Sequence, residues 1–322
     1  MPIIPHSFYR PPFLFRNGHL QTVYPSIART LSPDLYRRER IATPDDDFLD
    51  LDWARIGSDK FAVLSHGLEG NTHRHYMVGM ARMLNRRGWD VLAWNYRACS
   101  GEMNRQLRMY HNGCTDDLDC VVRHALGDDK YEQISLVGFS LGGNLTLLYL
   151  GRKEGRPDER IKNAVVFSVP CDLQAGAMEL ARAKNCLYMK QFLVSLHEKI
   201  RKKMEQMPGR LDDRGYWRIT DFKGFDDRYT APINGFRDAE DYWFQCSSGR
   251  LLSAIAVPTL IVNSLDDPFL AGGCYPIAQA EASPFVHLEM PAAGGHLGFV
   301  SFNGDGSYLS EQRTVAFLGQ ER

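Results

Sequence analysis

The 322-residue sequence lacks the features that mark secreted, membrane-spanning or nucleic-acid-binding proteins. Its seven cysteines are scattered, odd in number and never spaced as CxxC, which argues against a disulfide framework and a zinc site. No stretch reaches about 18 consecutive apolar residues, the length that a transmembrane helix needs. The first residues, MPIIPHSFYRPPFLF, lack the basic start and clean apolar run of a signal peptide. A formal net charge of -1 without clustered basic residues speaks against nucleic acid as a partner. We therefore expect a cytoplasmic protein with reduced thiols and no transmembrane segment.

Internal repeats and low-complexity tracts are also absent, whereas apolar residues make up 44% of the chain, enough for a sizeable core. From residue 61 onward, short apolar runs alternate with helical patterns, at 61–64, 89–94, 134–137, 164–167, 258–262 and 285–290. This alternation predicts parallel strands that are buried on both faces. With two more strand-like runs within residues 35–56, we expect an α/β fold with an eight-stranded, mostly parallel sheet.

One segment, residues 171–252, breaks this alternation because it contains no convincing strand. It holds a helical stretch at 175–207 and a loop-rich, aromatic stretch at 217–244. A connection of this length is too long for an ordinary loop, so we expect it to cover the rest as a cap. The predicted organisation is an extended N-terminal arm at 1–34, a core formed by 35–170 and 253–322, and a mainly helical cap insertion at 171–252.

The stretch VGFSLGGN at 137–144 places Ser140 between Gly138 and Gly142, with a strand before it and a helix after it. A tight turn of this kind holds a serine hydroxyl clear of the sheet and needs neighbours without side chains. We predict Ser140 as a nucleophile and the N–H of Leu141 as a donor to an oxyanion. A second donor is expected from SHGLEG at 65–70, where we choose Leu68. His66 is expected to shape that loop.

A serine nucleophile needs a base and an orienting acid, and on this architecture they follow in the order Ser, acid, His. Asp266 and Asp267 both follow the strand at 258–262, so spacing alone leaves a choice between them. Asp267 directly precedes a proline, whose ring restricts the backbone before it, and this favours Asp267. His296 follows the last strand in a glycine-rich loop and is the predicted base. His287 also follows the acids, but it lies inside a strand.

Two further patterns resemble metal sites but lack the ligands or the spacing that a metal site needs. His73 and His75 lie close together but have no acidic or cysteine partner at a useful spacing. The acidic turn at 45–47 does not have the spacing of a calcium loop. We expect no metal and no cofactor.

With these residues in place, the sequence resembles the YheT/EMB8-like branch of the α/β-hydrolases, which includes the mammalian ABHD1/2/3-type proteins. The matching stretches are RNGHLQT at 16–22, SHGLEGN at 65–71, NYRACSGEMNR at 95–105, YHNGCTDDL at 110–118, GFSLGGN at 138–144, TAPINGFRDAEDYW at 230–243, DDPF at 266–269 and GGHLGFV at 294–300. The resemblance implies an α/β-hydrolase fold and a catalytic triad that falls on Ser140, Asp267 and His296. Ala98 stands where the family usually has glycine, which puts the shape of that loop in doubt but leaves the triad intact.

These features predict a serine hydrolase that cleaves carboxylic esters, with short- to medium-chain acyl groups or lipid-like substrates, through an acyl-enzyme. The aromatic cap favours an uncharged or zwitterionic small-molecule ester with an apolar acyl chain. One alternative is an acyltransferase that uses the same triad, with an alcohol or amine in place of water. The other is a binding module without catalysis on a hydrolase fold.

Overall fold

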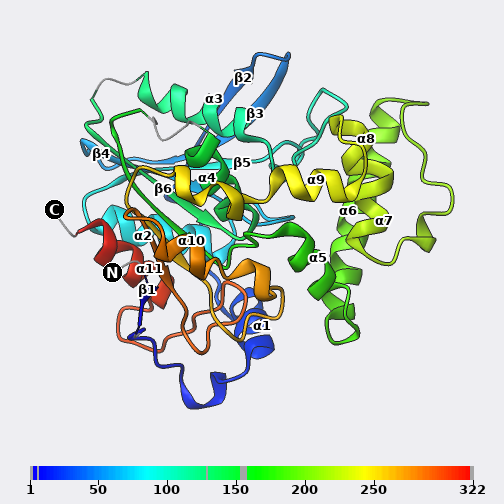
Figure 1. Cartoon of the computed structure of the whole chain (residues 1–322). Helices are drawn as coiled ribbons and strands as arrows, with labels where there is room; N and C mark the ends of the chain where they lie inside the picture. Colours follow the sequence, from blue (N-terminus) through cyan, green and yellow to red (C-terminus); the bar gives the residue numbers. More distant parts are fainter. Residues whose placement is uncertain (1–2, 6, 128–129, 153–157, 320–322) are drawn as a thin grey trace.

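A nine-stranded sheet forms the centre of the molecule (Figure 1). The computed structural model describes residues 3–5, 7–127, 130–152 and 158–319. The strand order is β1-β9-β8-β7-β6-β4-β5-β3-β2, and neighbouring strands are parallel except where β3 pairs with β2 and β5. The strands are β1 (Ile3–Ile4), β2 (Arg37–Thr43), β3 (Asp47–Ala54), β4 (Lys60–Ser65), β5 (Asp90–Asn95), β6 (Gln133–Phe139), β7 (Ile161–Phe167), β8 (Thr259–Val262) and β9 (Val286–Glu289).

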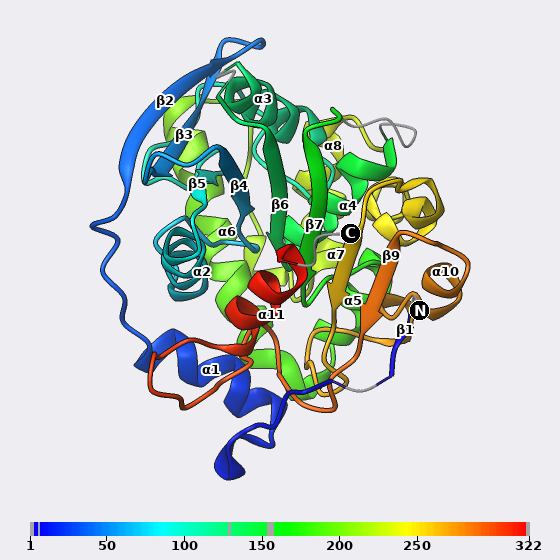
Figure 2. The same ribbon diagram turned by 90° about the vertical axis from the view of Figure 1, so that its left-hand side faces the viewer.

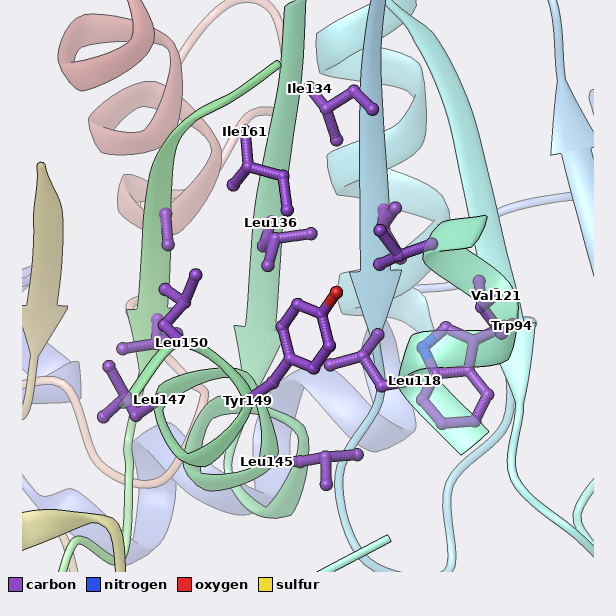
Figure 3. Packing of buried hydrophobic residues seen from close by; sticks show 14 of the residues in the cluster. Trp94, Leu118, Val121, Ile134, Leu136, Leu145, Leu147, Tyr149, Leu150 and Ile161 are labelled. Atoms are coloured by element: carbon purple, nitrogen blue, oxygen red, sulfur yellow. The ribbon is translucent and has the colours of Figure 1, made fainter. Parts of the chain in front are cut away.

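Helices cover both faces of this sheet, which is why its central strands are apolar throughout. In β6, Ile134 and Leu136 face one hydrophobic cluster, whereas Val137 and Phe139 face the other. The first cluster is shared with α3 (Thr115–Leu126), α4 (Leu141–Arg152) and α10 (Ile277–Glu281), and the second with α2 (His75–Arg86) and α11 (Leu309–Leu318). Figure 3 shows the first cluster, in which side chains of α4 lie against those of β6. The layered arrangement is that of an α/β hydrolase.

The eight strands predicted from the sequence are all present, and the sheet is mostly parallel as expected. The ninth strand, β1, has only two residues and pairs in parallel with β9 at the edge of the sheet. A two-residue strand has no periodicity of its own, so the sequence does not reveal it.

Helices fill the long connection between β7 and β8, and residues 171–252 contain no strand. The predicted helical stretch at 175–207 is two helices with a break at 181–185. The stretch expected to be rich in loops instead consists largely of short helices. The helices are α5 (Leu173–Leu180), α6 (Cys186–Gln206), α7 (Phe222–Phe225), α8 (Ala231–Asn234) and α9 (Ala239–Cys246). Helices α5 to α8 share a small hydrophobic cluster built around Leu193, Ile200 and Tyr229, whereas α9 packs in a second cluster with α5. Within the described part of the chain, no helix is long and apolar enough to cross a membrane.

The N-terminal segment corrects one expectation, because it is not extended along its whole length. It forms a short 3-10 helix, η1 (Phe13–Phe15), and an eleven-residue helix, α1 (Gly18–Ala28). The Asn17 side chain caps α1 by accepting a hydrogen bond from the N–H of Leu20, 3.1 Å away. The helix was not predicted because this segment is rich in proline, with Pro25 inside the helix itself, and because its buried residues are Gly18, Gln21 and Pro25 rather than large apolar side chains.

Candidate active site

Ser140 occupies the turn between β6 and α4, and its backbone is in the left-handed region with a φ of 53°. A Cβ atom on Gly138 would lie 2.4 Å from the carbonyl oxygen of Gly142. A Cβ atom on Gly142 would lie 2.2 Å from the carbonyl oxygen of Ser65. Both contacts are far inside van der Waals distance, so this turn can form only with glycine at the two positions. The glycines thus permit a strained turn that presents the Ser140 side chain at the end of the strand.

The structure brings Ser140, His296 and Asp267 into one chain of hydrogen bonds. The Oγ atom of Ser140 lies 2.9 Å from Nε2 of His296. On the other side of the ring, Nδ1 lies 2.9 and 3.1 Å from the two carboxylate oxygens of Asp267. The Asp267 carboxylate also accepts the N–H of Phe269 at 2.9 Å and is buried. A buried carboxylate against Nδ1 leaves Nε2 free to accept a proton from the serine.

Asp266, the competing acid, points elsewhere. Its Oδ1 accepts the N–H of Gly295 at 2.8 Å, and its Oδ2 is buried without a partner among the described residues. Burial raises the pKa of the Asp266 carboxyl group. Asp266 therefore contacts the backbone of the loop that carries His296, whereas Asp267 contacts the imidazole.

The two predicted oxyanion donors, Leu68 and Leu141, both line the cavity beside Ser140. Leu141 is the first residue of α4, so its N–H has no acceptor within the helix. The N–H groups on either side of Leu68 are occupied, since Gly67 donates to the Tyr76 hydroxyl at 3.1 Å and Glu69 to the Tyr110 hydroxyl at 2.9 Å. Within the described residues, no hydrogen bond engages the N–H of Leu68.

The loop of Leu68 is held in place from several sides. His66 is fully buried, with Nδ1 2.8 Å from the carbonyl oxygen of Gly67 and Nε2 accepting the N–H of Tyr96 at 3.3 Å. Burial lowers the pKa of His66 to about 3, so the ring is neutral and shapes the loop. From α6, Lys199 forms an ion pair with Glu69 at 2.7 Å. These contacts connect the loop to both the sheet and the helical segment at 171–252.

Ala98 adopts the left-handed backbone conformation that favours glycine, with a φ of 62°. This explains why the family resemblance leads us to expect a glycine at this position, and alanine adopts the same conformation here.

The other histidines considered in the sequence do not take part in the hydrogen bonds of Ser140, His296 and Asp267. His287 lies within β9, as expected. Burial lowers the pKa of His75 to about 3. The described residues include no group of three or more His, Cys, Asp or Glu side chains that could hold a metal.

Helix α1 supports the loop of His296, a role that the sequence did not reveal. The N–H of His296 donates to Oγ1 of Thr22 at 2.9 Å, and the Thr22 hydroxyl donates to the carbonyl oxygen of Gly18 at 2.7 Å. A Cβ atom on Gly295 would lie 2.3 Å from that same carbonyl oxygen. The glycine before His296 therefore allows α1 to approach the loop closely. The RNGHLQT stretch carried the family resemblance, but no local pattern connects it with residues more than 270 positions away.

A cavity of about 500 Å³ extends from Ser140 and His296 beneath the helical segment. Thr22 and Ser26 of α1 lie in its wall on one side. Aromatic and aliphatic side chains of the helical segment dominate the other side, among them Leu180, Phe192, Leu196, Phe222, Phe225, Tyr229, Ile233 and Trp243. A long, mostly apolar cavity next to a serine suits a substrate with an apolar chain.

The Asp226 carboxyl group lies in the apolar wall of this cavity, which the sequence did not predict. It accepts hydrogen bonds from Nε1 of Trp243 at 2.8 Å and from the Thr230 hydroxyl at 2.6 Å. No Lys, Arg or His in the described residues forms an ion pair with it. Burial raises the pKa of Asp226 to about 7. The carboxyl group therefore titrates near neutral pH inside the cavity.

Comparisons with known proteins agree with this fold. The family profile described as alpha/beta hydrolase fold matches residues 63–201. The chain is 34% identical over 292 residues to YheT of Escherichia coli (strain K12), named as a candidate esterase, and the match covers 89% of this chain and 85% of that protein. It is 28% identical over 309 residues to phospholipase ABHD3 of Mus musculus, covering 93% and 74%. Among solved structures, an esterase of Pyrococcus furiosus superimposes with a TM-score of 0.61 at 17% identity, covering 98% of both chains, which shows the fold.

Proposed function

The chain belongs to the YheT/ABHD-type family of α/β hydrolases, and we propose that within it the protein is a serine esterase that works through an acyl-enzyme. Its relatives make it an enzyme of the ester-hydrolase type. The observation that carries the finer proposal is the uninterrupted set of hydrogen bonds from Ser140 through His296 to Asp267.

In the proposed reaction, Oγ of Ser140 attacks the carbonyl carbon of the ester while Nε2 of His296 takes the hydroxyl proton. Asp267 stabilises the resulting imidazolium. The N–H groups of Leu68 and Leu141 donate to the oxyanion of the tetrahedral intermediate. Its collapse breaks the ester C–O bond, and the alcohol leaves with the proton from His296. Water then attacks the acyl-enzyme and passes a proton to His296, which returns it to Ser140 as the acid departs.

The helical segment at 171–252 is proposed as a cap over this site, separate from a core of 35–170 and 253–322 and an arm at 1–34. Its apolar lining supports an uncharged or zwitterionic ester with an apolar acyl chain, including lipid-like esters. The mouse relative named a phospholipase and the yeast relative named a monoacylglycerol lipase favour the same class. No cofactor is needed for this chemistry. The seven cysteines are free thiols, which supports a cytoplasmic location.

Labelling with a fluorophosphonate probe tests the nucleophile directly. The probe should attach to Ser140, and Ser140→Ala should lose both the label and ester hydrolysis. Ser26 lines the same cavity, but its hydroxyl donates to the carbonyl oxygen of Val23, so Ser26→Ala is the matched control and should label normally. Folded protein that is labelled at another serine, or not at all, would contradict the proposal and favour a binding module.

Acyl transfer by the same triad remains the second candidate, because the described geometry accepts an alcohol in place of water. Product analysis with an added acceptor alcohol distinguishes the two reactions. Hydrolysis predicts free acid as the main product, whereas an acyltransferase would give mainly the new ester.

A further inference from the structure

Helix α1 is exposed on its apolar side and buried on its polar side. Leu20, Val23 and Ile27 share one face by their spacing and are exposed, Ile27 by 76%. On the opposite side, Gln21 is fully buried and accepts the N–H of Val300 at 2.9 Å. A helix at the surface of a globular protein normally shows the reverse pattern. The described part of the chain therefore leaves the apolar face of α1 uncovered.

More exposed large apolar side chains come from the arm before α1 and from a loop that packs against it. Phe8 and Phe13 are 92% and 78% exposed, and Leu14 and Phe302 are also exposed. The ring of Phe302 packs edge-on against Phe15 of η1, with centroids 5.4 Å apart, which joins its loop to the arm. We define the arm patch as Phe8, Phe13, Leu14, Leu20, Val23, Ile27 and Phe302. An exposed apolar group of this extent marks an interaction surface.

The charged residues of the arm are all arginines before its last position, Asp34. Residues 1–33 contain three arginines and no aspartate or glutamate. Arg29 is engaged by Glu311 at 2.6 Å, but Arg10 and Arg16 are exposed and form no ion pair within the described residues. The loop of Phe302 carries one acidic residue, Asp305, whose carboxylate accepts a hydrogen bond from the Ser307 hydroxyl. Exposed aromatic and aliphatic side chains flanked by arginines are typical of segments that lie at the head-group boundary of a membrane.

The cavity opens beside this surface. Thr22 and Ser26, on the next face of α1, line the cavity, and Ser26 is also exposed to solvent. His19 of α1 lies 3.1 Å from the Tyr188 hydroxyl of α6, so α1 contacts the helical segment on this side of the molecule. Figures 1 and 2 both show η1 and α1 at the lower end of the molecule, next to the loop that leads into α11. A surface in contact with the arm patch would therefore lie next to the opening.

We propose that the arm patch docks the protein on a phospholipid surface that carries negative charge. Phe13, Leu14 and Ile27 enter the acyl-chain boundary, while Arg10 and Arg16 contact head-group phosphates. The docking does not depend on the chemistry of Ser140. It places the opening of the cavity at the surface from which a lipid-like ester can enter without crossing water.

A lipid surface fits the arm patch better than a protein partner. In both views, the arm projects from the lower end of the molecule (Figures 1 and 2). Its most exposed side chains come from the loop at Phe8, from η1 and from α1, and not from one continuous face. A bilayer accepts protruding side chains without a complementary groove, whereas a protein partner must match their shape. The unpaired arginines add attraction to anionic head groups.

Vesicle flotation tests the proposal with the full chain carrying Ser140→Ala, so that lipid hydrolysis does not alter the vesicles. We expect binding to equimolar phosphatidylcholine and phosphatidylglycerol, and weaker binding to phosphatidylcholine alone. Phe13→Ser with Leu14→Ser should weaken binding about tenfold or more. Arg10→Glu with Arg16→Glu should weaken binding to the anionic vesicles specifically. Added salt should likewise weaken the binding of the chain with an unchanged arm to these vesicles.

Two controls make the outcome decisive. Ile56 and Trp217 are exposed apolar residues outside the arm patch, so Ile56→Ser and Trp217→Ser should bind vesicles like the parent chain. When the same arm substitutions are made in the chain that retains Ser140, hydrolysis of a water-soluble short ester should be unchanged. Absence of vesicle binding, or equal binding by the arm and control variants, would overturn the proposal. A dimer that disappears with the Phe13 and Leu14 changes would also overturn it, in favour of a second copy as the partner. Failure of probe labelling at Ser140 would affect the proposed chemistry alone.

Discussion

Replacing Asp226 with asparagine should change how the stability of the protein depends on pH. The Asp226 carboxyl group is buried in the cavity wall, accepts two hydrogen bonds and has no cationic partner in the described residues. Burial raises its pKa from 3.8 to about 7. The folded chain therefore holds a proton on this group at pH values where the unfolded chain has released it.

The direction and size of the effect follow from proton linkage. Between about pH 4 and pH 7 the folded state binds more protons at Asp226, so the free energy of unfolding falls as pH rises, by at most about 1.4 kcal/mol per unit. Over three units this amounts to at most about 4 kcal/mol. The contribution is complete below the unfolded pKa and is lost as pH passes the folded pKa. Asparagine cannot titrate, so the variant lacks this component.

Urea unfolding at pH 5, 6, 7 and 8 measures the difference. The asparagine amide can accept from Trp243 through its oxygen and donate to the Thr230 hydroxyl through its nitrogen, as the protonated carboxyl group does, so the substitution should change stability little at low pH. The stability of Asp226→Asn relative to the parent should then rise from pH 5 to about pH 7 and level off by pH 8. Asp34, an exposed carboxylate, provides the control, and Asp34→Asn should parallel the parent. A constant difference between Asp226→Asn and the parent would refute the reasoning.

Three further results are expected from activity measurements. Asp267→Asn should lower kcat about a thousandfold or more, because only Asp267 contacts the His296 ring. Asp266→Asn should lower kcat less than tenfold at equal stability. The reverse order would contradict the assignment of Asp267. The kcat/KM should rise from acetyl to butyryl or hexanoyl esters, by roughly tenfold for every two methylenes, and should fall for longer chains. A decline in kcat/KM from the acetyl ester onward would exclude an apolar acyl site. Thr22→Val should lower kcat about tenfold with little change in KM, because the His296 N–H loses its acceptor. Thr22→Ser should restore the rate, and equal rates for both variants would show that this contact does not position His296.

The parts of the molecule that the sequence predicted are those whose causes are local. The turn at Ser140 requires glycine at 138 and 142 because their neighbours in space are the backbone of the same turn and of the adjacent strand β4. The central strands are continuous apolar runs because helices cover both faces of the sheet. Asp267 and His296 follow strands β8 and β9, and the carboxyl ends of parallel strands meet at one edge.

The parts that escaped prediction depend on contacts between distant segments. Asp226 is one of several acids in its stretch, and nothing nearby in the sequence indicates that α9 brings Trp243 against it. The pKa of a carboxyl group depends on its burial, and burial is a property of the assembled helices. Likewise, Thr22 contributes to the site by accepting the N–H of His296, whose loop comes more than 270 residues later.

The failure to predict α1 comes from its composition. Pro25 lies inside the helix, where proline is normally excluded, and the side that faces the core carries Gly18 and Gln21 while Leu20, Val23 and Ile27 face outward. Its core-facing side contains Gly18, which lies against the loop of His296, and Gln21, which accepts the N–H of Val300 in the same loop. A helix that supported the loop and had no external partner would gain stability and solubility from polar residues at positions 20, 23 and 27. Retaining Leu, Val and Ile there exposes apolar area to water at a cost in free energy, unless a lipid surface covers that area.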